Sequence, residues 1–381
     1  MEAPEGFKFS AVECGIKYEN RFDLGLIYCE FPGVAWGVFT KNSVKAAPVL
    51  LGKKIIKSEV HRAIVVNSGN ANACTGQEGL EDAKRIINDL AEHLKVSEKE
   101  VLPASTGVIG ERLPVNKILP KLKDLVEGLS PLRIEDFAKA IMTTDTKPKI
   151  SYREVNGIKV LGIAKGAGMI APNMATMLAF ILTDGVFQKE TIKKLLPKFT
   201  EESFNRITID GDTSTNDTVY LVSSNRKEVK DYQELKQAIL DVMKELAYKI
   251  VEDGEGVTKV IRIVIKGAKT KKHAKELAHA VANSPLVKTA FYGADPNWGR
   301  LFSAMGKTGI EFAFDKVEVY LNGVCWVNNL KTCASEEELK KLMENKDQEL
   351  IIKLKEGRQS YEVLTGDLTE KYIEINAMYR S

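Results

Sequence analysis

The residues best suited to chemistry in this sequence lie between Lys165 and Phe180, in the stretch Lys-Gly-Ala-Gly-Met-Ile-Ala-Pro-Asn-Met-Ala-Thr-Met-Leu-Ala-Phe. A hydroxyl is a poor nucleophile until a base lies within hydrogen-bond reach of it. In an N-terminal threonine the α-amine, with a pKa of about 7.7–8, lies beside the hydroxyl and can act as that base. Thr176 would reach this state if its hydroxyl attacked the carbonyl of Ala175 and the chain broke between the two residues.

The same stretch also fits an ordinary structural role. Gly166 and Gly168 would form a turn that leads into a buried strand over 177–182, and for an arbitrary sequence this interpretation is the better one. The segment has neither the length nor the order of a Walker loop, so a phosphate cradle is a poor interpretation. The small Ala175 and the permissive glycines would equally allow the tight turn that attack on a carbonyl needs.

Other candidate catalytic groups are few. The five cysteines show no CxxC spacing, which indicates reduced core thiols rather than a disulfide framework or a zinc site. Cys74, in an Asn/Gly-rich loop, is an alternative nucleophile without an activating neighbour in the sequence. Asp210, Asp212 and Asp217 miss the EF-hand spacing, so we interpret them as turn-forming scaffold and expect no metal site.

Composition and charge exclude several classes of protein. The chain has 381 residues, 44% of them apolar and 28% charged, as in an ordinary soluble globular protein. Its net charge is +3, so we expect no nucleic-acid partner. The most apolar run, 169–182, is interrupted by polar residues and is too short to span a bilayer. The first five residues lack the basic region of a secretory signal, so we expect a cytoplasmic protein without a membrane anchor.

Hydrophobic periodicity predicts a mixed α/β protein. We expect a large α/β domain over 1–290 and a smaller α/β domain over 291–381, because beyond about residue 292 the pattern becomes a compact strand–helix–strand succession. The expected strands are 63–66, 177–182, 260–265, 317–324, 350–354 and 372–377. The expected helices are 80–94, 232–251, 272–283 and one capped by Ser335 that runs through 343.

The stretch from Lys165 to Leu178 resembles the signature of the ornithine acetyltransferase (glutamate N-acetyltransferase, ArgJ-type) family, in which the chain cuts itself between the Ala and Thr of Met-Ala-Thr-Met-Leu. The resemblance extends over nearly the whole chain, and ordered blocks are far more specific than one motif. The further blocks are Asn67–Gly76, Pro103–Gly110, Met142–Thr146, Asp210–Asp217, Glu252–Gly256, Gly293–Arg300 and Asn376–Ser381.

The resemblance implies an activity and an architecture. The enzyme would move acetyl from N-acetylornithine to glutamate through an acetyl-Thr176 ester, as a step of arginine biosynthesis. The fold would be the α/β sandwich of ArgJ- and DmpA-like proteins. Cleavage between Ala175 and Thr176 would give chains of residues 1–175 and 176–381, which would associate as α2β2 or larger. The resemblance assigns stabilisation of the oxyanion to Thr106 and Gly107.

The resemblance also implies substrate contacts. Both substrates carry an α-carboxylate and ornithine adds a cation, so the site needs a cation, a carboxylate and neutral hydrogen-bonding groups. Lys165 can hold a carboxylate and Glu255 an ammonium group. The substrate-binding residues implied are Thr143, Lys165, Thr176, Glu255, Asn376 and Ser381. No cofactor is implied, and whether acetyl-CoA serves as a co-substrate stays open, since only some members use it.

Two other classes of function compete with this interpretation. With water as the acceptor, the same nucleophile would give an N-terminal-threonine aminopeptidase or amidohydrolase. In a non-enzymatic binding protein, Thr176 would be a core residue and the chain would stay intact. Stimulation of N-acetylornithine turnover by glutamate separates the transferase from the hydrolase.

Overall fold

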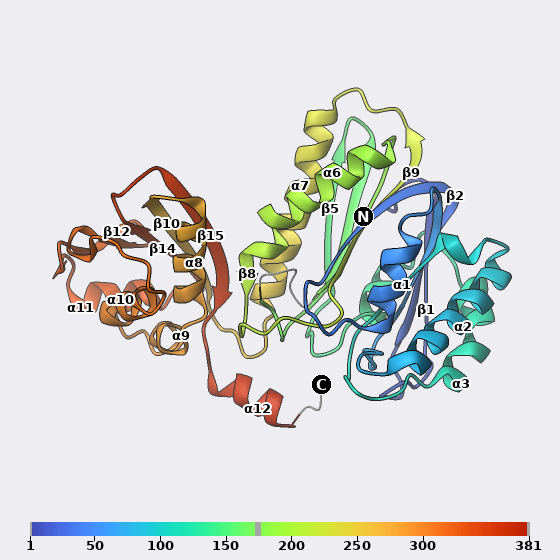
Figure 1. Cartoon of the computed structure of the whole chain (residues 1–381), viewed down its shortest axis with the longest axis horizontal. Helices are drawn as coiled ribbons and strands as arrows, with labels where there is room; N and C mark the ends of the chain where they lie inside the picture. The colour runs from blue at the N-terminus through green and yellow to red at the C-terminus, as the bar shows by residue number, and fades with distance from the viewer. Residues whose placement is uncertain (1, 172–176, 379–381) are drawn as a thin grey trace. The chain divides into compact units, whose positions relative to one another are not determined.

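The computed structural model describes residues 2–171 and 177–378, which form two compact units. The first unit contains the described residues up to Asn205 together with Asp212–Ile250, and the second contains Arg206–Gly211 and the described residues from Val251 on. Most of the second unit is coloured from ochre to red in Figure 1. Three residues singled out in the sequence, Ala175, Thr176 and Ser381, lie outside the described residues.

The first unit alternates strands and helices along the chain. Its strands are β1 (Phe7–Val12), β2 (Leu24–Phe39), β3 (His61–Asn67), β4 (Val101–Ser105), β5 (Lys149–Val155), β6 (Ile158–Lys165), β7 (Leu178–Gly185) and β9 (Thr218–Lys227). Its helices are α1 (Ala47–Ile55), α2 (Gly76–Leu94), α3 (Val115–Ile118), α4 (Leu122–Glu127), α5 (Ile134–Ala140), α6 (Lys189–Glu202) and α7 (Tyr232–Glu252). The strands pair in the order β4-β3-β2-β9-β7-β6-β5, with β1 beside β2.

The long strand β2 joins two layers of this sheet. Its first half pairs with β1 and β3, its second half pairs with β9, and the register breaks between Tyr28 and Gly33. A Cβ on Gly33 would lie 2.8 Å from the carbonyl oxygen of His61 and 3.1 Å from that of Ser223, so only glycine fits where the backbones converge. A single core fills the space between the layers, with Phe9, Phe180 and Tyr220 among its buried side chains.

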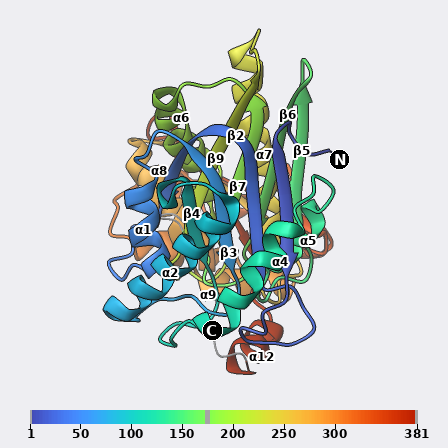
Figure 2. The ribbon, with the colours of Figure 1, turned by 90° about the vertical axis from the view of Figure 1, so that its right-hand side faces the viewer.

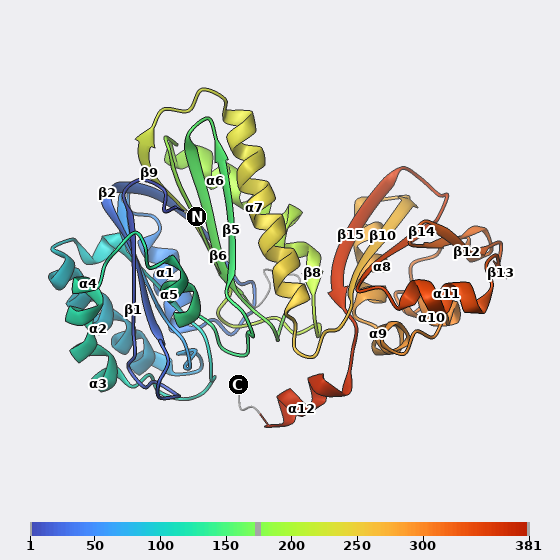
Figure 3. The same cartoon turned by 180° about the vertical axis from the view of Figure 1, so that it is seen from behind.

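Helices cover the outer faces of both layers. Helices α2 and α4 lie on one layer (Figure 2). Their apolar side chains form a second core with that layer, which includes Val65 and Leu90. Helix α7 lies along the other layer (Figure 3), so closely that a Cβ on Gly162 would lie 2.4 Å from Val242. The result is an α–β–β–α sandwich, which confirms the mixed α/β sandwich expected from the sequence.

The second unit is built on one mixed sheet. Its strands pair in the order β13-β12-β11-β14-β10-β15-β8. These strands are β8 (Ile207–Thr208), β10 (Val260–Ala268), β11 (Glu318–Leu321), β12 (Val324–Asn328), β13 (Lys331–Thr332), β14 (Asp347–Lys353) and β15 (Gln359–Gly366). The helices are α8 (Lys271–Ala282), α9 (Pro285–Tyr292), α10 (Trp298–Gly306), α11 (Glu336–Met343) and α12 (Glu370–Met378).

By packing, the second unit contains Arg206–Gly211 and the described residues from Val251 on, whereas the sequence led us to expect a division after residue 290. The reason is that β10 pairs with both β14 and β15, and α8 buries its apolar face in the core of that sheet. These two elements precede residue 290 in the sequence but complete the C-terminal core in space. Hydrophobic periodicity cannot show this, because it indicates which face of a helix or strand is buried but not which element packs against that face.

The strand predicted over 372–377 is wrong, since these residues belong to helix α12. The β-branched Ile373 and Ile375 favoured a strand, but β-propensity expresses packing on a half-buried sheet face rather than a property of the backbone. Here Ile373 is 66% exposed and has no sheet face to cover. The predicted cap of α11 is confirmed, because the Ser335 hydroxyl accepts from the Glu338 N–H at 3.2 Å.

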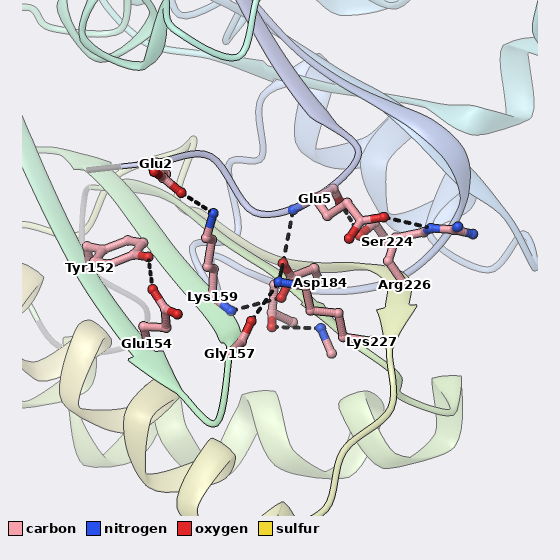
Figure 4. Close-up of polar contacts among 12 residues, drawn as sticks. Glu2, Glu5, Tyr152, Glu154, Gly157, Lys159, Asp184, Ser224, Arg226 and Lys227 are labelled. Carbon is pink, nitrogen blue, oxygen red and sulfur yellow. Dashed lines mark hydrogen bonds and ion pairs between the residues drawn. The ribbon is translucent and has the colours of Figure 1, made fainter.

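A buried carboxylate anchors the N-terminal segment to the far end of β7 (Figure 4). Asp184 is fully buried and accepts hydrogen bonds from the backbone N–H groups of Glu5 at 3.0 Å and Lys159 at 2.8 Å. The Lys227 ammonium lies 3.1 Å from the same carboxylate. One side chain therefore ties the N-terminal segment to β6, β7 and β9.

We expect Asp184→Ala to lower the free energy of unfolding by about 3 kcal/mol, because it leaves two backbone N–H groups without their acceptor and the lysine without its partner. Chemical denaturation followed by circular dichroism measures this. The matched control is Glu2→Ala, which removes an exposed partner of Lys159 and should change stability little. Equal losses in the two variants would contradict the anchoring role of Asp184.

Candidate active site

Thr106 and Gly107 lie at the end of β4, against the loop that follows β3. The Thr106 N–H donates to the carbonyl oxygen of Asn67 at 3.0 Å, and the residue is buried. Gly107 has φ of +133°, and a Cβ there would lie 2.3 Å from the carbonyl carbon of Gly69 and 2.4 Å from the Asn70 nitrogen. Only glycine can place the backbone of residue 107 this close to the neighbouring loop.

Lys165, the last residue of β6, connects the predicted site residues of the first unit. Its side chain is buried, and its ammonium donates to the hydroxyl of Thr143 at 2.8 Å and to that of Thr106 at 3.2 Å. These residues come from three separate parts of the sequence. The structure therefore brings together Thr106, Gly107, Thr143 and Lys165 where several strands end.

Asp145 holds this cluster in place. Its buried carboxylate lies 2.6 Å from the Lys149 ammonium and 3.9 Å from that of Lys165. It also accepts from the backbone N–H of Thr143 at 3.0 Å and from that of Gly166 at 2.7 Å. Burial by itself raises the pKa of this carboxyl, but the two ammonium groups outweigh burial and hold the pKa well below its usual range.

A second buried carboxyl holds the first described residue after the predicted cleavage point. Asp217 accepts from the Met177 N–H at 3.1 Å, and the Thr218 N–H donates to the Met177 carbonyl oxygen at 3.1 Å. Burial raises the pKa of Asp217 well above its usual range, which favours the protonated carboxyl. Both backbone groups of Met177, just before β7, are thus hydrogen-bonded, which fixes the start of the strand.

Asn216 joins the two layers of the sandwich beside this point. Its side-chain amide donates to the carbonyl oxygens of Ala71 at 2.6 Å and Ser105 at 2.8 Å. The loop before β9 is thereby attached to β4 and to the loop after β3. These two hydrogen bonds give Asn216 a role in positioning the site.

In the second unit, Glu255 and Asn376 lie together. The Asn376 amide donates to the Glu255 carboxylate at 2.7 Å and to the carbonyl oxygen of Tyr372 at 3.0 Å. Glu255 is buried, and among the described residues of its own unit no cation pairs with it. Gly256 has φ of +72°, and a Cβ on it would lie 2.6 Å from the Tyr372 nitrogen, so the turn that presents Glu255 depends on glycine.

Sequence reasoning did not single out Asp145, Asn216 or Asp217 as site residues. Asp217 was interpreted as turn-forming scaffold, and it does precede a strand, but its side chain contacts Met177, 40 residues earlier. Their positions in the sequence could have pointed to them. Asp145 lies in the same block of family resemblance as Thr143, and Asn216 and Asp217 end the block that begins at Asp210.

The described residues contain no cluster of three or more His, Cys, Asp or Glu side chains that could hold a metal ion. All five cysteines lie in the described part of the chain and are free thiols. Within residues 2–171 and 177–378, no helix has the length and apolar character needed to cross a membrane.

We expect acid to destabilise the protein partly through Asp145. Because its pKa is lower in the folded state than the unfolded value of about 3.9, its stabilising contribution is present above pH 4 and is lost as the pH falls further. Asp145→Asn should be less stable at pH 7 and should show a shallower loss of unfolding free energy between pH 5 and pH 2.

Denaturant titrations at each pH measure this effect. Asp124→Asn is the matched control, because Asp124 is exposed and its pairing with Lys121 is a surface contact. The assignment fails if Asp145→Asn keeps the wild-type slope.

The chain is similar to known proteins over nearly its whole length. The ArgJ family model matches residues 8–381. The chain is 44% identical over 390 residues to the arginine biosynthesis bifunctional protein ArgJ of Desulfotalea psychrophila, with 99% of each chain covered. It is 43% identical over 399 residues to the protein of the same name from Thermotoga neapolitana, with both chains fully covered. The crystal structure of a Bacillus halodurans bifunctional protein ArgJ is 34% identical and has a TM-score of 0.50, covering 52% of this chain and 98% of that one.

Proposed function

The chain belongs to the ArgJ family, and from this premise we propose that it is an acetyltransferase of arginine biosynthesis that moves acetyl from N-acetylornithine to glutamate. The observation that carries the proposal is the match over residues 8–381 to relatives named as arginine biosynthesis proteins. The cluster around Lys165 supports it, because hydroxyl and backbone groups suited to acyl transfer gather beside the start of β7.

The proposed enzyme first activates itself. The Thr176 hydroxyl attacks the Ala175 carbonyl, the acyl group moves from nitrogen to oxygen, and water hydrolyses the ester. This releases the Thr176 amine and gives chains 1–175 and 176–381. The amine then accepts the hydroxyl proton as Thr176 attacks the acetyl carbonyl of N-acetylornithine, and it returns the proton to the departing ornithine amine. The glutamate amine attacks the acetyl ester in the second half-reaction.

Thr106 and Gly107 are the proposed donors to the oxyanion. The Thr106 hydroxyl accepts from the Lys165 ammonium, so its own proton is directed elsewhere and is polarised by a neighbouring cation. The Gly107 N–H would be the second donor, on a backbone whose position is fixed by its close approach to Gly69. Donors held in place before charge develops are the main source of transition-state stabilisation in acyl transfer.

The charged groups of the substrates are assigned to individual residues. Lys165 would hold a carboxylate with Thr143 beside it, and Glu255 would hold the ornithine side-chain ammonium. A buried carboxylate held by a neutral amide is suited to receive a cation from a ligand. Asn376 would orient Glu255, and Thr176 and Ser381, which lie outside the described residues, complete the proposed contacts.

The relatives' description as bifunctional supports acetyl-CoA as a second acetyl donor. We propose no resident cofactor. We further propose that the two chains stay associated, at least as α2β2, in the cytoplasm. Native size-exclusion chromatography followed by a denaturing gel tests this assembly, because fragments that elute apart would contradict it.

We expect two fragments from the wild-type chain, the second beginning with Thr176. Thr176→Ala should abolish both cleavage and transfer, while Thr176→Ser should keep part of each because the hydroxyl remains. Thr106→Ala should slow the reactions by about 10²–10³ without removing the nucleophile. N-terminal sequencing and acetyl-transfer assays measure these outcomes.

A new terminus elsewhere, or a chain that stays intact and active, would defeat the mechanism. The assay also tests the hydrolase alternative. If glutamate does not raise the turnover of N-acetylornithine, the acceptor is water and the protein is an amidohydrolase.

We expect Glu255→Gln to raise the KM for N-acetylornithine about tenfold or more, since the amide is isosteric but uncharged. Cleavage and the melting temperature should stay close to the wild-type values. Glu344→Gln, an exposed glutamate of the same unit, is the matched control. A lower melting temperature with an unchanged KM would show that Glu255 is a structural residue only.

A further inference from the structure

The turn that carries Glu255 packs directly against the start of helix α12. Gly256 lies so close to that helix that a Cβ on it would be 2.6 Å from the Tyr372 nitrogen and 2.7 Å from the Thr369 hydroxyl oxygen. Helix α12 also carries Asn376, whose amide donates to the Glu255 carboxylate at 2.7 Å, across 121 residues of sequence. The contact between Glu255 and Asn376 therefore requires that the turn and the helix be held in a fixed arrangement.

Thr369 joins the turn to the helix. It immediately precedes α12 and is buried. Its hydroxyl donates to the Gly256 carbonyl oxygen at 2.7 Å, and its own carbonyl oxygen accepts from the Tyr372 N–H at 3.3 Å. A buried hydroxyl without an acceptor is costly, so Thr369 favours the arrangement in which the Gly256 carbonyl lies within its reach.

Asp367, at the end of β15, fixes the chain on the other side of the same turn. Its side chain is buried, and one carboxylate oxygen accepts from the N–H groups of Thr258 at 2.8 Å and Lys259 at 2.9 Å. The other carboxylate oxygen accepts from the Thr258 hydroxyl. The Asp367 N–H donates to the Lys259 carbonyl oxygen at 3.1 Å. The chain that leaves the Glu255 turn is thus held by four hydrogen bonds to one residue.

The backbone at Gly256 is the part of the turn that most needs such restraint. Its φ of +72° lies in the left-handed region, which glycine enters and leaves at little cost. Because Glu255 is joined directly to this residue, a rotation there would move the carboxylate away from Asn376. Charge-assisted hydrogen bonds need close and well-aligned groups, so such a movement would weaken the binding of an ammonium group by Glu255.

Resting on the proposed function, we propose that Thr369 is a positioning residue for donor binding, which acts through Glu255 rather than on the ligand itself. Its hydroxyl fixes the Gly256 carbonyl, and Asp367 fixes the chain beyond it. The Glu255 carboxylate is thereby presented in one orientation, beside the Asn376 amide. The group that this arrangement receives is the side-chain ammonium of the donor.

Thr369→Val and Thr369→Ser in the full-length, self-cleaved enzyme test the proposal, because valine removes the hydroxyl at nearly constant shape and serine keeps it. We expect Thr369→Val to raise the KM for N-acetylornithine about fivefold, from loss of one hydrogen bond, with kcat little changed. Thr369→Ser should stay within about twofold of the wild-type KM. Steady-state kinetics of acetyl transfer to glutamate measure both values.

Two comparisons separate positioning from general stability. In the double variant Thr369→Val/Glu255→Gln, the KM should equal that of Glu255→Gln alone, since a hydroxyl that acts through the carboxylate has no effect once the charge is gone. Thr289→Val is the matched control, because this exposed hydroxyl also donates to a backbone carbonyl oxygen, that of Pro285 at 2.9 Å, but within α9. It should leave KM and kcat unchanged.

Thr258→Val tests the other side of the turn with little risk to folding. Thr258 is exposed, and the change removes its hydroxyl contact with Asp367 but keeps its N–H contact. We expect the KM for N-acetylornithine to rise about twofold to threefold with kcat unchanged. This variant decides the matter if Thr369→Val does not fold.

A wild-type KM in Thr369→Val, or a raised KM that Thr369→Ser does not restore, would overturn the proposal. Additive effects in the double variant would also overturn it, as would a wild-type KM in Thr258→Val where Thr369→Val does not fold. A wild type that does not transfer acetyl from N-acetylornithine would remove the proposed function itself. An active wild type that responds to Glu255→Gln but not to Thr369→Val would remove this proposal alone.

Discussion

The arrangement of the site depends on the buried carboxylate of Asp145. A carboxylate removed from water is costly unless cations and N–H groups surround it. Asp145 meets this need with Lys149, Lys165 and the backbone of Thr143 and Gly166. The start of β5, the end of β6 and the loop after α5 must therefore come together for the fold to be complete. The same assembly points the Lys165 ammonium at two threonine hydroxyls, so folding and preparation of the site are one event.

Strand β7 explains how a chain broken before it could remain one protein. It is buried throughout and lies between β6, antiparallel, and β9, parallel. Cleavage before Thr176 would place β6 in one piece and β7 with β9 in the other, so separating the pieces would break this ladder and open the core between the layers. Asp217 holds the beginning of β7 and Asp184 its far end, roughly 20 Å away. The strand that follows the proposed cleavage point is thus fixed at both ends.

The sequence predicted the elements that carry their own periodic signal, among them α2, α7 and the buried strand β7. The sequence predicted a strand where helix α12 lies, because Ile373 has strand propensity, but in the structure this residue is exposed and covers no sheet. Its site residues came from a resemblance, and the structure shows that Thr106, Thr143 and Lys165 are in contact, although their roles stay proposals. Asp145 and Asp217 were not predicted, because each acts on groups 20 to 40 residues away in the sequence. Local patterns record which residues are buried but not which distant group each one meets.

The two buried carboxyls also differ in a way that suits the proposed base. Asp145 is kept charged by its lysines, while burial favours the protonated form of Asp217. An α-amine acts as a base near neutral pH when its pKa is not raised by nearby anions. A protonated Asp217 beside Met177, the residue that follows Thr176, would hydrogen-bond to the backbone without adding negative charge there. The negative charge of Asp145 is meanwhile matched by Lys149 and Lys165. Asp217 and Asp145 can therefore position the start of β7 and the Lys165 cluster without raising the pKa of the Thr176 amine. That amine could then be unprotonated near neutral pH and act as the proposed base.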